Sequence, residues 1–371
     1  MILVLNTGSS SLRCALFRPG AHAPAWRAHV AEIGQEPRLS VDGIISDRER
    51  SPTGDHAAVA RWLFARLPSA PNAAGHRVVH GGLHYAAPVR LDARVVEALE
   101  GLVPLAPAHQ PQALACIRAV GESWPDLPQV ACFDTAFHRT QDRLAQLYPL
   151  PRALIDEGLV RFGFHGLSYA HVARTFPHGR VLAAHLGHGA SLCAIRDGRS
   201  VATTMGFTTL DGLMMSSRSG AVDPGLVLHL IRERGLSPDA VAELLNERSG
   251  LLGVSGISDD VRVLEASGAP EAREALDLFA YRVVREAGSL FAALGGLDTL
   301  VFTGGIGEHA TPVRAGICRG LAFAGAVLDE AANGQGKASI GDPSSTVAIR
   351  IVPADEEREI ALSVAGLLGG R

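Results

Sequence analysis

The stretch ILVLNTGSSSLRCALF, residues 2–17, joins two short apolar runs through a turn of glycine and serines. Residues 181–195, VLAAHLGHGASLCAI, repeat this plan about half a chain later. Apolar runs on both sides of a tight polar turn predict a β-hairpin. The likeness of SLRCAL to ASLCAI favours two related halves that each open with such a hairpin. An accidental likeness stays open on the residues alone.

The rest of the chain alternates between helical and strand patterns. Helical periodicity occurs at 55–67, 91–103, 224–235, 238–248, 271–294 and 356–368, and strand-like apolar runs occur at 297–302 and 347–352. A chain of 371 residues is long for one core, so we expect about two domains. The alternation predicts the α/β class.

Composition excludes several classes of function. The net charge of −4 and the lack of a basic run argue against nucleic acid as a partner. No apolar run approaches the roughly 18 residues of a membrane span, and the N-terminus lacks the basic segment of a signal peptide. Five cysteines without CxxC spacing argue against zinc knuckles and disulfides, so we expect a cytoplasmic protein.

Lysine usage narrows the chemistry further. Lys337, in the loop-like stretch NGQGKAS, is the only lysine among 34 basic residues of the Lys and Arg types. Walker-type phosphate loops, protein kinases and Schiff-base enzymes each need a lysine at a defined place. Any phosphate chemistry here must therefore use arginine, histidine, backbone N–H groups and metal.

Three glycine-rich turns could bind a ligand. The turns at 6–11 and 185–191 could hold a polyphosphate, since glycine and serine let backbone N–H groups approach phosphate oxygens. Each could equally be a plain hairpin turn, and the two histidines of HLGHGAS (185–191) leave a metal site or a catalytic pair open. GIGEHA at 305–310 has the GxGxxA form of dinucleotide sites, which on its own is weak support for a nicotinamide oxidoreductase.

Histidine, arginine and aspartate gather in further loop-like stretches. These stretches are HRVVHGGLH (76–84), LAPAHQP (105–111), FDTAFH (133–138), RFGFHGLS (161–168) and TTLDGLMMSSRSG (208–220). None has the HExxH spacing of a transition-metal site. The adjoining glycines and prolines indicate specified loop geometry, which is where functional residues concentrate.

Taken together, these motifs resemble the acetate kinase family. The resemblance runs in order from residue 2 to about 361 through NTGSSSL, RVVHGG, FDTAFH, GFHG, MGFTTLDG, LGVSGISDDVR, FTGGIGE and DEE (355–357). It implies the reaction ATP + acetate ⇌ ADP + acetyl phosphate with Mg²⁺ or Mn²⁺. It also implies a duplicated actin-like (ribonuclease H-like) fold, with two α/β domains around an interdomain cleft, usually as a homodimer. The domains expected are 1–133 plus 358–371, and 134–357.

The resemblance also implies roles for individual residues. Asn6 and Glu356 would be the metal-site residues, Arg77 and Arg218 the pair that binds the carboxylate and the phosphoryl group, His165 the transition-state stabiliser, His109 a second donor and Asp134 the catalytic acidic residue. The acid pocket would be lined by Arg77, Val79, Ala108, Phe164 and Thr209. The nucleotide would contact Arg13, His185, Leu186, Gly187, His188, Gly189, Asp260, Val261, Arg262, Gly305, Ile306, Gly307, Glu308 and His309.

The acceptor's chemistry explains these residue types. A carboxylate nucleophile is already ionised at pH 7, so it needs no general base. We therefore expect Asp134 to orient Mg²⁺, Arg77 or water rather than to abstract a proton. The barrier lies in bringing one anion to another, and a stabilising arginine contributes roughly 10³–10⁵ in rate.

Several positions depart from the family pattern. Arg13 stands where lysine is usual, His188 replaces asparagine, and Ala108, Gln110 and Thr209 alter the acid-pocket motifs. A pocket widened in this way would favour propionate or another short acid. A cationic His188 would tighten nucleotide binding below roughly pH 6.5. A nucleotide-binding regulator without catalysis is the other alternative.

Overall fold

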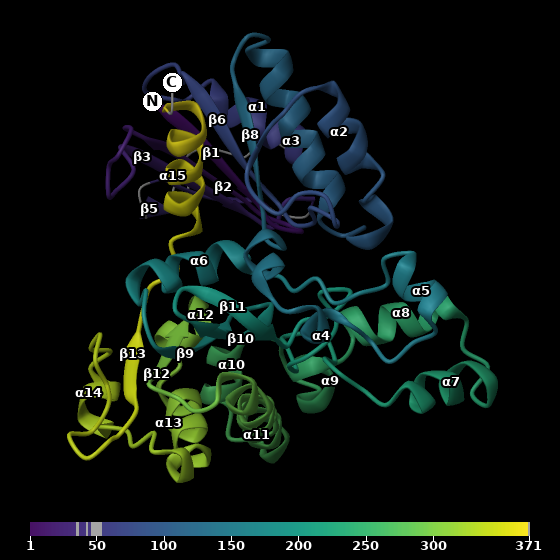
Figure 1. The fold of residues 1–371 in the computed structure, drawn as a ribbon, viewed down its shortest axis with the longest axis vertical. Helices are drawn as coiled ribbons and strands as arrows, with labels where there is room; N and C mark the ends of the chain where they lie inside the picture. Colours follow the sequence, from purple (N-terminus) through teal and green to yellow (C-terminus); the bar gives the residue numbers. More distant parts are fainter. Residues whose placement is uncertain (35–36, 42–43, 46–53, 370–371) are drawn as a thin grey trace. The chain divides into compact units, whose positions relative to one another are not determined.

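The structure is a computed structural model that describes residues 1–34, 37–41, 44–45 and 54–369 (Figure 1). It forms two compact units, of which unit 1 comprises Met1–Arg139, Gly166–His171 and the chain from Asp355. Unit 2 comprises Thr140–His165 and Val172–Ala354. Asp134 thus lies in unit 1, although the predicted division, which remains a prediction, puts it in the second domain. Among the described residues, no helix is long and apolar enough to cross a membrane.

Unit 1 contains an eight-stranded sheet with the strand order β5-β4-β3-β2-β1-β6-β8-β7. Its strands are β1 (Ile2–Thr7), β2 (Leu12–Phe17), β3 (Trp26–Ala31), β4 (Arg38–Val41), β5 (Ile44–Ile45), β6 (Ala73–Val78), β7 (Val89–Arg90) and β8 (Gln129–Phe133). β1 and β2 pair antiparallel with Ile2 opposite Phe17, which confirms the first predicted hairpin. β1, β6 and β8 are parallel, so their carboxyl ends meet at one edge of the sheet.

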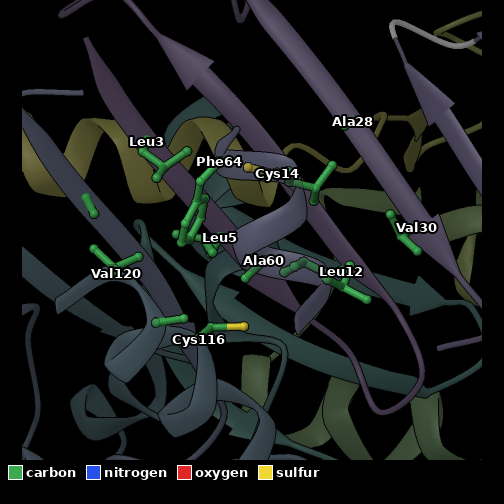
Figure 2. Close-up of a cluster of buried hydrophobic side chains, with 14 of the residues drawn as sticks. Leu3, Leu5, Leu12, Cys14, Ala28, Val30, Ala60, Phe64, Cys116 and Val120 are labelled. Atoms are coloured by element: carbon green, nitrogen blue, oxygen red, sulfur yellow. The ribbon is translucent and has the colours of Figure 1, made fainter. Parts of the chain in front are cut away.

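Helices cover both faces of this sheet. They are α1 (His56–Phe64), α2 (Ala93–Glu100), α3 (Gln110–Ser123) and α15 (Glu356–Gly369), with 3₁₀ turns at Val103–Leu105 and Ala136–Thr140. Every residue of β1 is buried, as expected for a strand packed on both faces. Leu3 and Leu5 lie in one core cluster with Phe64 of α1 and Val120 of α3 (Figure 2). The alternate residues Ile2 and Val4 lie in a second cluster that includes residues of α15.

Unit 2 is built on a five-stranded sheet with the order β11-β10-β9-β12-β13. The strands are β9 (Arg180–Leu186), β10 (Ala190–Arg196), β11 (Arg199–Thr203), β12 (Thr299–Thr303) and β13 (Ala348–Ile351). β9 and β10 form the second predicted hairpin, and β12 is parallel to both β9 and β13. The carboxyl ends of these three parallel strands again share one edge.

The remaining helices belong mainly to unit 2. They are α4 (Arg143–Gln146), α5 (Arg152–Asp156), α6 (Gly166–Thr175), α7 (Pro224–Arg232), α8 (Pro238–Glu247), α9 (Gly250–Ser255), α10 (Val261–Ala266), α11 (Pro270–Leu294), α12 (Gly304–His309), α13 (Thr311–Gly320) and α14 (Glu330–Gly334), with a 3₁₀ turn at Ala322–Ala324. The longest, α11, begins with a proline, which needs no N–H partner there. It ends at Leu294 and is capped by Gly295, whose φ of +72° favours glycine.

The two sheets repeat one topology. In unit 1 the order β3-β2-β1-β6-β8 combines an antiparallel three-strand meander with two parallel strands. In unit 2 the order β11-β10-β9-β12-β13 combines the same relations in the same sequence. Two accidental hairpins would not bring matching parallel strands with them. The internal repeat expected from the two hairpins is therefore confirmed.

Candidate active site

In unit 1, the first hairpin turn lies at the carboxyl edge of the parallel strands. The Gly8 N–H donates to the Ser11 carbonyl oxygen at 2.8 Å, and a Cβ at Gly8 would come within 2.5 Å of Ser11 Oγ. His56 of α1 donates from Nε2 to the Gly8 carbonyl oxygen at 3.1 Å. The turn is thus held from inside the hairpin and from the neighbouring helix.

Asn6, at the end of β1, joins the acidic residues at the start of α15. Its Nδ2 donates to Glu356 Oε2 at 2.9 Å and to Glu357 Oε1 at 3.0 Å, and its side chain is buried. Its Oδ1 accepts from Arg77 Nη1 at 3.3 Å. The amide therefore has one orientation, with nitrogen toward the glutamates and oxygen toward the guanidinium.

Arg77, near the end of β6, makes a forked ion pair with Asp134, which follows β8. Arg77 Nη2 donates to Asp134 Oδ2 at 2.7 Å, and Nε lies 3.1 Å from the same oxygen. Burial by itself would lower the pKa of Arg77, but the charges of Asp134 and Glu356 outweigh burial and raise it. Burial raises the pKa of Asp134, and the guanidinium opposes that rise. The ion pair with Arg77 thus favours the ionised form of the buried Asp134 carboxyl group.

This cluster in unit 1 suits a hard divalent cation. Three carboxylates face the single buried guanidinium, and Arg13, whose side chain is 53% exposed, lies 3.8 Å from Glu357. Mg²⁺ prefers oxygen ligands, keeps several waters and takes only one or two carboxylates from the protein. Within the part of the chain that the structure describes, no three His, Cys, Asp or Glu side chains form a ready metal cage. The excess acid and the carboxylate and amide oxygens fit a largely hydrated ion.

The predicted acid-pocket residues of unit 1 lie in two loops. Val79 is buried directly after β6, whereas Ala108 is exposed. His109 is the N-cap residue of α3 and is half-buried. Gln110, one of the departures from the family pattern, donates to the His80 carbonyl oxygen at 3.1 Å and accepts from the His80 N–H at 3.2 Å. Gln110 therefore ties the loop after β6 to the start of α3.

In unit 2, the second hairpin turn has a more open geometry. The Gly187 N–H donates to the Gly189 carbonyl oxygen at 3.1 Å. A Cβ at Gly187 would lie 3.9 Å from the Gly305 nitrogen, so this turn lies beside the start of α12. Two predicted glycine turns therefore meet at the carboxyl edge of this sheet. Leu186, which precedes the turn, is buried in the core.

The His165 side chain packs against the β9–β10 hairpin. Its ring stacks on that of His185, with centroids 4.2 Å apart, and its Nδ1 lies 2.8 Å from Ser191 Oγ. His185 and Ser191 are opposite each other in the β9–β10 register, so their side chains share one face. His165 also has a φ of +58°, a left-handed conformation that costs a non-glycine residue about 1–3 kcal/mol. Strain of this kind is typical of functional sites.

The side chains of Arg218 and His165 both lie close to Gly189 in this turn. A Cβ at Gly189 would lie 2.9 Å from Arg218 Nη2 and 3.2 Å from His165 Nε2, so both nitrogens converge on this glycine. Arg218 Nη1 donates to the Thr209 carbonyl oxygen at 2.7 Å. Among the described residues, no carboxylate pairs with Arg218, and desolvation lowers its pKa to about 10. An unneutralised guanidinium beside a glycine turn is suited to an anion.

His188 takes no part in this convergence. Its side chain is 64% exposed, and its Nδ1 lies 3.9 Å from Asp259 Oδ2. Desolvation and the charge of Arg218 lower the pKa of His188, while Asp259 opposes the shift. The pH range in which His188 gains charge is therefore lower than the ordinary value near 6.5 assumed in the sequence-based hypothesis.

The predicted nucleoside residues lie in two parts of unit 2. β12 leads directly into α12, where Gly304 has a φ of +76° and a Cβ would come within 2.8 Å of the Leu186 carbonyl oxygen. Gly305 faces open space, Ile306 and Glu308 are half-buried, Gly307 is buried and His309 is exposed. Asp260 caps α10 and pairs with Arg262 at 2.6 Å, while Val261 is buried.

The Arg314 side chain of α13 holds the C-terminal end of α12 in place through hydrogen bonds. Its side chain is 1% exposed, and Nη1 donates to the carbonyl oxygens of Gly307 (3.0 Å) and Glu308 (2.8 Å). Nε donates to Asn333 Oδ1 at 2.7 Å, and Nη2 donates to Thr311 Oγ1 and the Asn333 carbonyl oxygen, both at 3.2 Å. All five N–H donors thus have neutral acceptors. A cation at the C-terminal end of a helix stabilises that end.

Within each unit the structure brings together most of the predicted residues. Asn6, Arg77, Asp134 and Glu356 meet in unit 1, and His165, His185, Gly189 and Arg218 meet in unit 2. Phe164 is buried and Thr209 half-buried in unit 2. The predicted site lacked Glu357, Ser191 and Arg314. The motifs DEE and HLGHGAS contain the first two, so a signal existed for them, whereas no motif pointed to Arg314.

Comparisons with known proteins identify the family of this chain. The model of the acetokinase family matches residues 1–362. The acetate kinase of Nitrobacter hamburgensis is 46% identical over 391 residues, covering 99% of this chain and 96% of that protein. The acetate kinase of Rhizobium meliloti is 45% identical over 386 residues, covering 99% of this chain and 98% of that protein.

Solved structures extend the likeness to the fold. The acetate kinase of Porphyromonas gingivalis superposes with a TM-score of 0.86 at 33% identity and 99% coverage of both chains. A propionate kinase of Francisella tularensis superposes with a TM-score of 0.91 at 34% identity, covering 98% of this chain and 99% of that chain. These neighbours confirm the predicted α/β, actin-like fold. A nicotinamide oxidoreductase and a non-catalytic regulator are not favoured.

Proposed function

Because this chain belongs to the acetokinase family, a family of carboxylate kinases, we propose that it transfers the γ-phosphoryl group of ATP directly to acetate. The products are ADP and acetyl phosphate, and the reaction is reversible. The observation that carries the proposal is the convergence of Arg218 Nη2 and His165 Nε2 on Gly189, at a hairpin turn where no carboxylate among the described residues neutralises Arg218.

The cationic side chains of the two clusters suit the two anionic groups of this reaction, the transferring phosphoryl group and the acetate carboxylate. Arg218 and His165 would stabilise the equatorial oxygens of the transferring phosphoryl group, where negative charge accumulates. Arg77 would orient the acetate carboxylate, and Asp134 would hold Arg77 in place through the forked ion pair. No residue is needed as a general base, because acetate is ionised at neutral pH.

The remaining predicted residues serve binding. Backbone N–H groups at 188–189 and 304–305 would hold the phosphates, because the glycines there leave them accessible. Asp260, Arg262 and α12 would contact the nucleoside. Val79, Ala108, Phe164 and Thr209 would surround the methyl group of the acid, and His109 would donate near it.

Asn6, Glu356 and Glu357 would hold Mg²⁺ or Mn²⁺ through oxygen atoms and bridging water. Such an ion neutralises phosphate charge and supplies Lewis-acid assistance to the leaving group. For Asn6 Oδ1 to bind the ion, it would have to give up the hydrogen bond that it now accepts from Arg77 Nη1.

We also propose a homodimer in the cytoplasm. None of the nine residues of α7 is buried, and Leu226 and Leu228 on this helix are 46% and 48% exposed. Val222, just before the helix, is 36% exposed. An apolar helix without a buried residue is suited to a subunit interface. Five free, buried cysteines and the need for ATP suit a cytoplasmic protein. Sedimentation equilibrium tests the dimer, and a monomer at micromolar concentration would contradict it.

A coupled assay of acetate-dependent ADP formation tests the proposed function. We expect activity that requires a divalent cation, disappears with EDTA and returns with Mg²⁺ or Mn²⁺. Comparing kcat/KM for acetate, propionate and butyrate identifies the acceptor, and one methylene is worth about 1–3 kcal/mol in such a pocket. ADP formation that is independent of any short acid would contradict the proposal.

A further inference from the structure

The product of the proposed reaction is itself a reactive molecule. An acyl phosphate transfers its acyl group to neutral amines and to thiolates. An enzyme that releases such a product is exposed to it at every turnover. The inference below rests on the proposed function, and it concerns which side chains of this chain the product can modify.

The chain has very few amines. Lys337 is its only lysine, and it lies within six consecutive exposed residues, 334–339, that begin with the last residue of α14. Its backbone N–H donates to the Ala332 carbonyl oxygen at 3.1 Å, and no acidic side chain among the described residues pairs with its ammonium group. The other amine is the N-terminal group of Met1, which donates to Asn72 Oδ1 at 2.7 Å.

The thiols are all withdrawn from solvent. Cys14, Cys116, Cys132, Cys193 and Cys318 are each no more than 1% exposed. Burial raises the pKa of Cys116, Cys132, Cys193 and Cys318 to about 12, and it also raises that of Cys14. Since the thiolate is the nucleophile, a buried thiol that stays protonated is inert.

The arginine side chains of the candidate site are also unreactive toward an acyl phosphate. Arg13, Arg77 and Arg218 carry guanidinium groups, which stay protonated and offer no lone pair to an acyl donor. Arg13 is the most accessible of those placed near the turn of unit 1, with 53% of its side chain exposed. A lysine at that position would be an amine within reach of solvent.

We propose that Lys337 is the single side-chain site at which acetyl phosphate modifies this protein, and that the reaction site offers no group that it can acylate stably. The neutral Nζ attacks the carbonyl carbon, the bond from that carbon to the phosphate oxygen breaks, and inorganic phosphate leaves with the electron pair. The amine proton passes to water, and an amide forms. The modified side chain loses its positive charge.

Peptide mapping by mass spectrometry tests the site with added acetyl phosphate. We expect one acetylated side chain, Lys337, in the native protein and none in a Lys337→Arg variant, with the Met1 peptide scored separately. The five cysteine peptides should be unmodified in the native protein and should become reactive when it is unfolded in denaturant. An unmodified Lys337, or acetylated cysteines in the native protein, would overturn the proposal.

A second experiment uses Arg13→Lys, which places an amine beside Glu357. We expect peptide mapping to find a second acetylated side chain at position 13 in this variant, and none there in the wild type or in Lys337→Arg. An unmodified position 13 in the variant, or an acetylated side chain within the candidate site of the wild type, would overturn the second half of the proposal. Replacing added acetyl phosphate by ATP, Mg²⁺ and acetate separates the two proposals. Modification of Lys337 by the added compound alone would contradict the proposed function and leave the site standing.

Discussion

The hairpin turns at 8–11 and 187–189 occupy equivalent places in two sheets of the same strand order, yet their surroundings are opposite in charge. Beside the first, Asp134, Glu356 and Glu357 outnumber the one buried guanidinium of Arg77. Beside the second, Arg218 has no carboxylate partner among the described residues. One topology thus provides a place for a cation in unit 1 and a place for an anion in unit 2.

The difference shows how one strand order can carry opposite charges at equivalent edges of two sheets. The strand order sets where side chains gather, because the carboxyl ends of parallel strands share an edge. The residues at those ends decide what is bound. The proposed in-line transfer between anions needs both a metal and fixed cations, and the charges beside the two turns suit one of these each.

The largest effect should come from removing the unpaired cation of unit 2. In Arg218→Gln we expect kcat to fall by about 10³ or more, because the phosphoryl charge loses its guanidinium. The unfolding free energy should stay the same or rise, since the desolvated charge costs stability at every pH below its pKa of about 10. Steady-state kinetics and denaturant unfolding measure both. A strongly destabilised variant would show that Arg218 is a structural residue.

Removing the paired cation of unit 1 should act in the opposite way on stability. Arg77→Gln leaves Asp134 buried without its partner, which costs about 3–5 kcal/mol. Burial then raises the pKa of Asp134 further, so the folded protein binds a proton more readily than the unfolded chain. Stability should therefore recover as the pH falls from about 8 to 5.

Denaturant unfolding at several pH values measures this recovery. The double variant Arg77→Gln with Asp134→Asn is the control, because it carries no buried charge to protonate. Its stability should change less between pH 8 and 5. If the single and double variants have the same pH dependence, Asp134 is not the group that titrates.

A smaller effect should follow from releasing His165 on its hairpin. In Ser191→Ala the contact at His165 Nδ1 is lost, and a hydrogen bond of this kind is worth about 0.5–1.5 kcal/mol. We expect kcat to fall up to about tenfold while KM for ATP stays unchanged. Ser200→Ala, which removes a buried serine that bonds Gln141 instead, is the matched control and should leave kcat unchanged.

The smallest effect concerns His188, and it depends on pH. Because the pKa of His188 is lowered, its ring is neutral at pH 7 and gains charge only below the ordinary range. KM for ATP should therefore decrease a few-fold in the wild type only at pH values below the ordinary imidazole pKa of about 6.5. His188→Asn should lack this decrease. An identical pH profile in the variant would remove His188 from the nucleotide site.

Much of the architecture could be predicted because local sequence patterns indicate its hairpins and most of its helices. Both hairpins follow from apolar runs around glycine and serine turns, and the six helical segments expected from periodicity all contain helices, of which 91–103 ends in a 3₁₀ turn. Helix α3 was not expected, since its first turn, HQPQ, reads as a polar loop. Its formation depends on packing, as Ala113, Leu114 and Ile117 are buried in a cluster with residues of β6 and β8.

The candidate site was predictable in its members and not in its contacts. Sequence reasoning paired Asn6 with Glu356 through a family resemblance, but the second acceptor, Glu357, depends on which way the amide is turned. Arg314 could not be found from the sequence, because a buried arginine bound only to neutral acceptors leaves no charge pattern. The acid preference attributed to Ala108 and Thr209 stays a prediction.

Arg314 gives the second half of the molecule a charge that mobile ions cannot reach. All five of its donors are used by neutral acceptors beneath the turn at 304–309, and its side chain is 1% exposed. Salt screens buried charges much less than exposed ones. The stabilisation that Arg314 gives to the C-terminal end of α12 should therefore persist at high ionic strength, whereas the attraction between the half-exposed Arg13 and Glu357 should weaken.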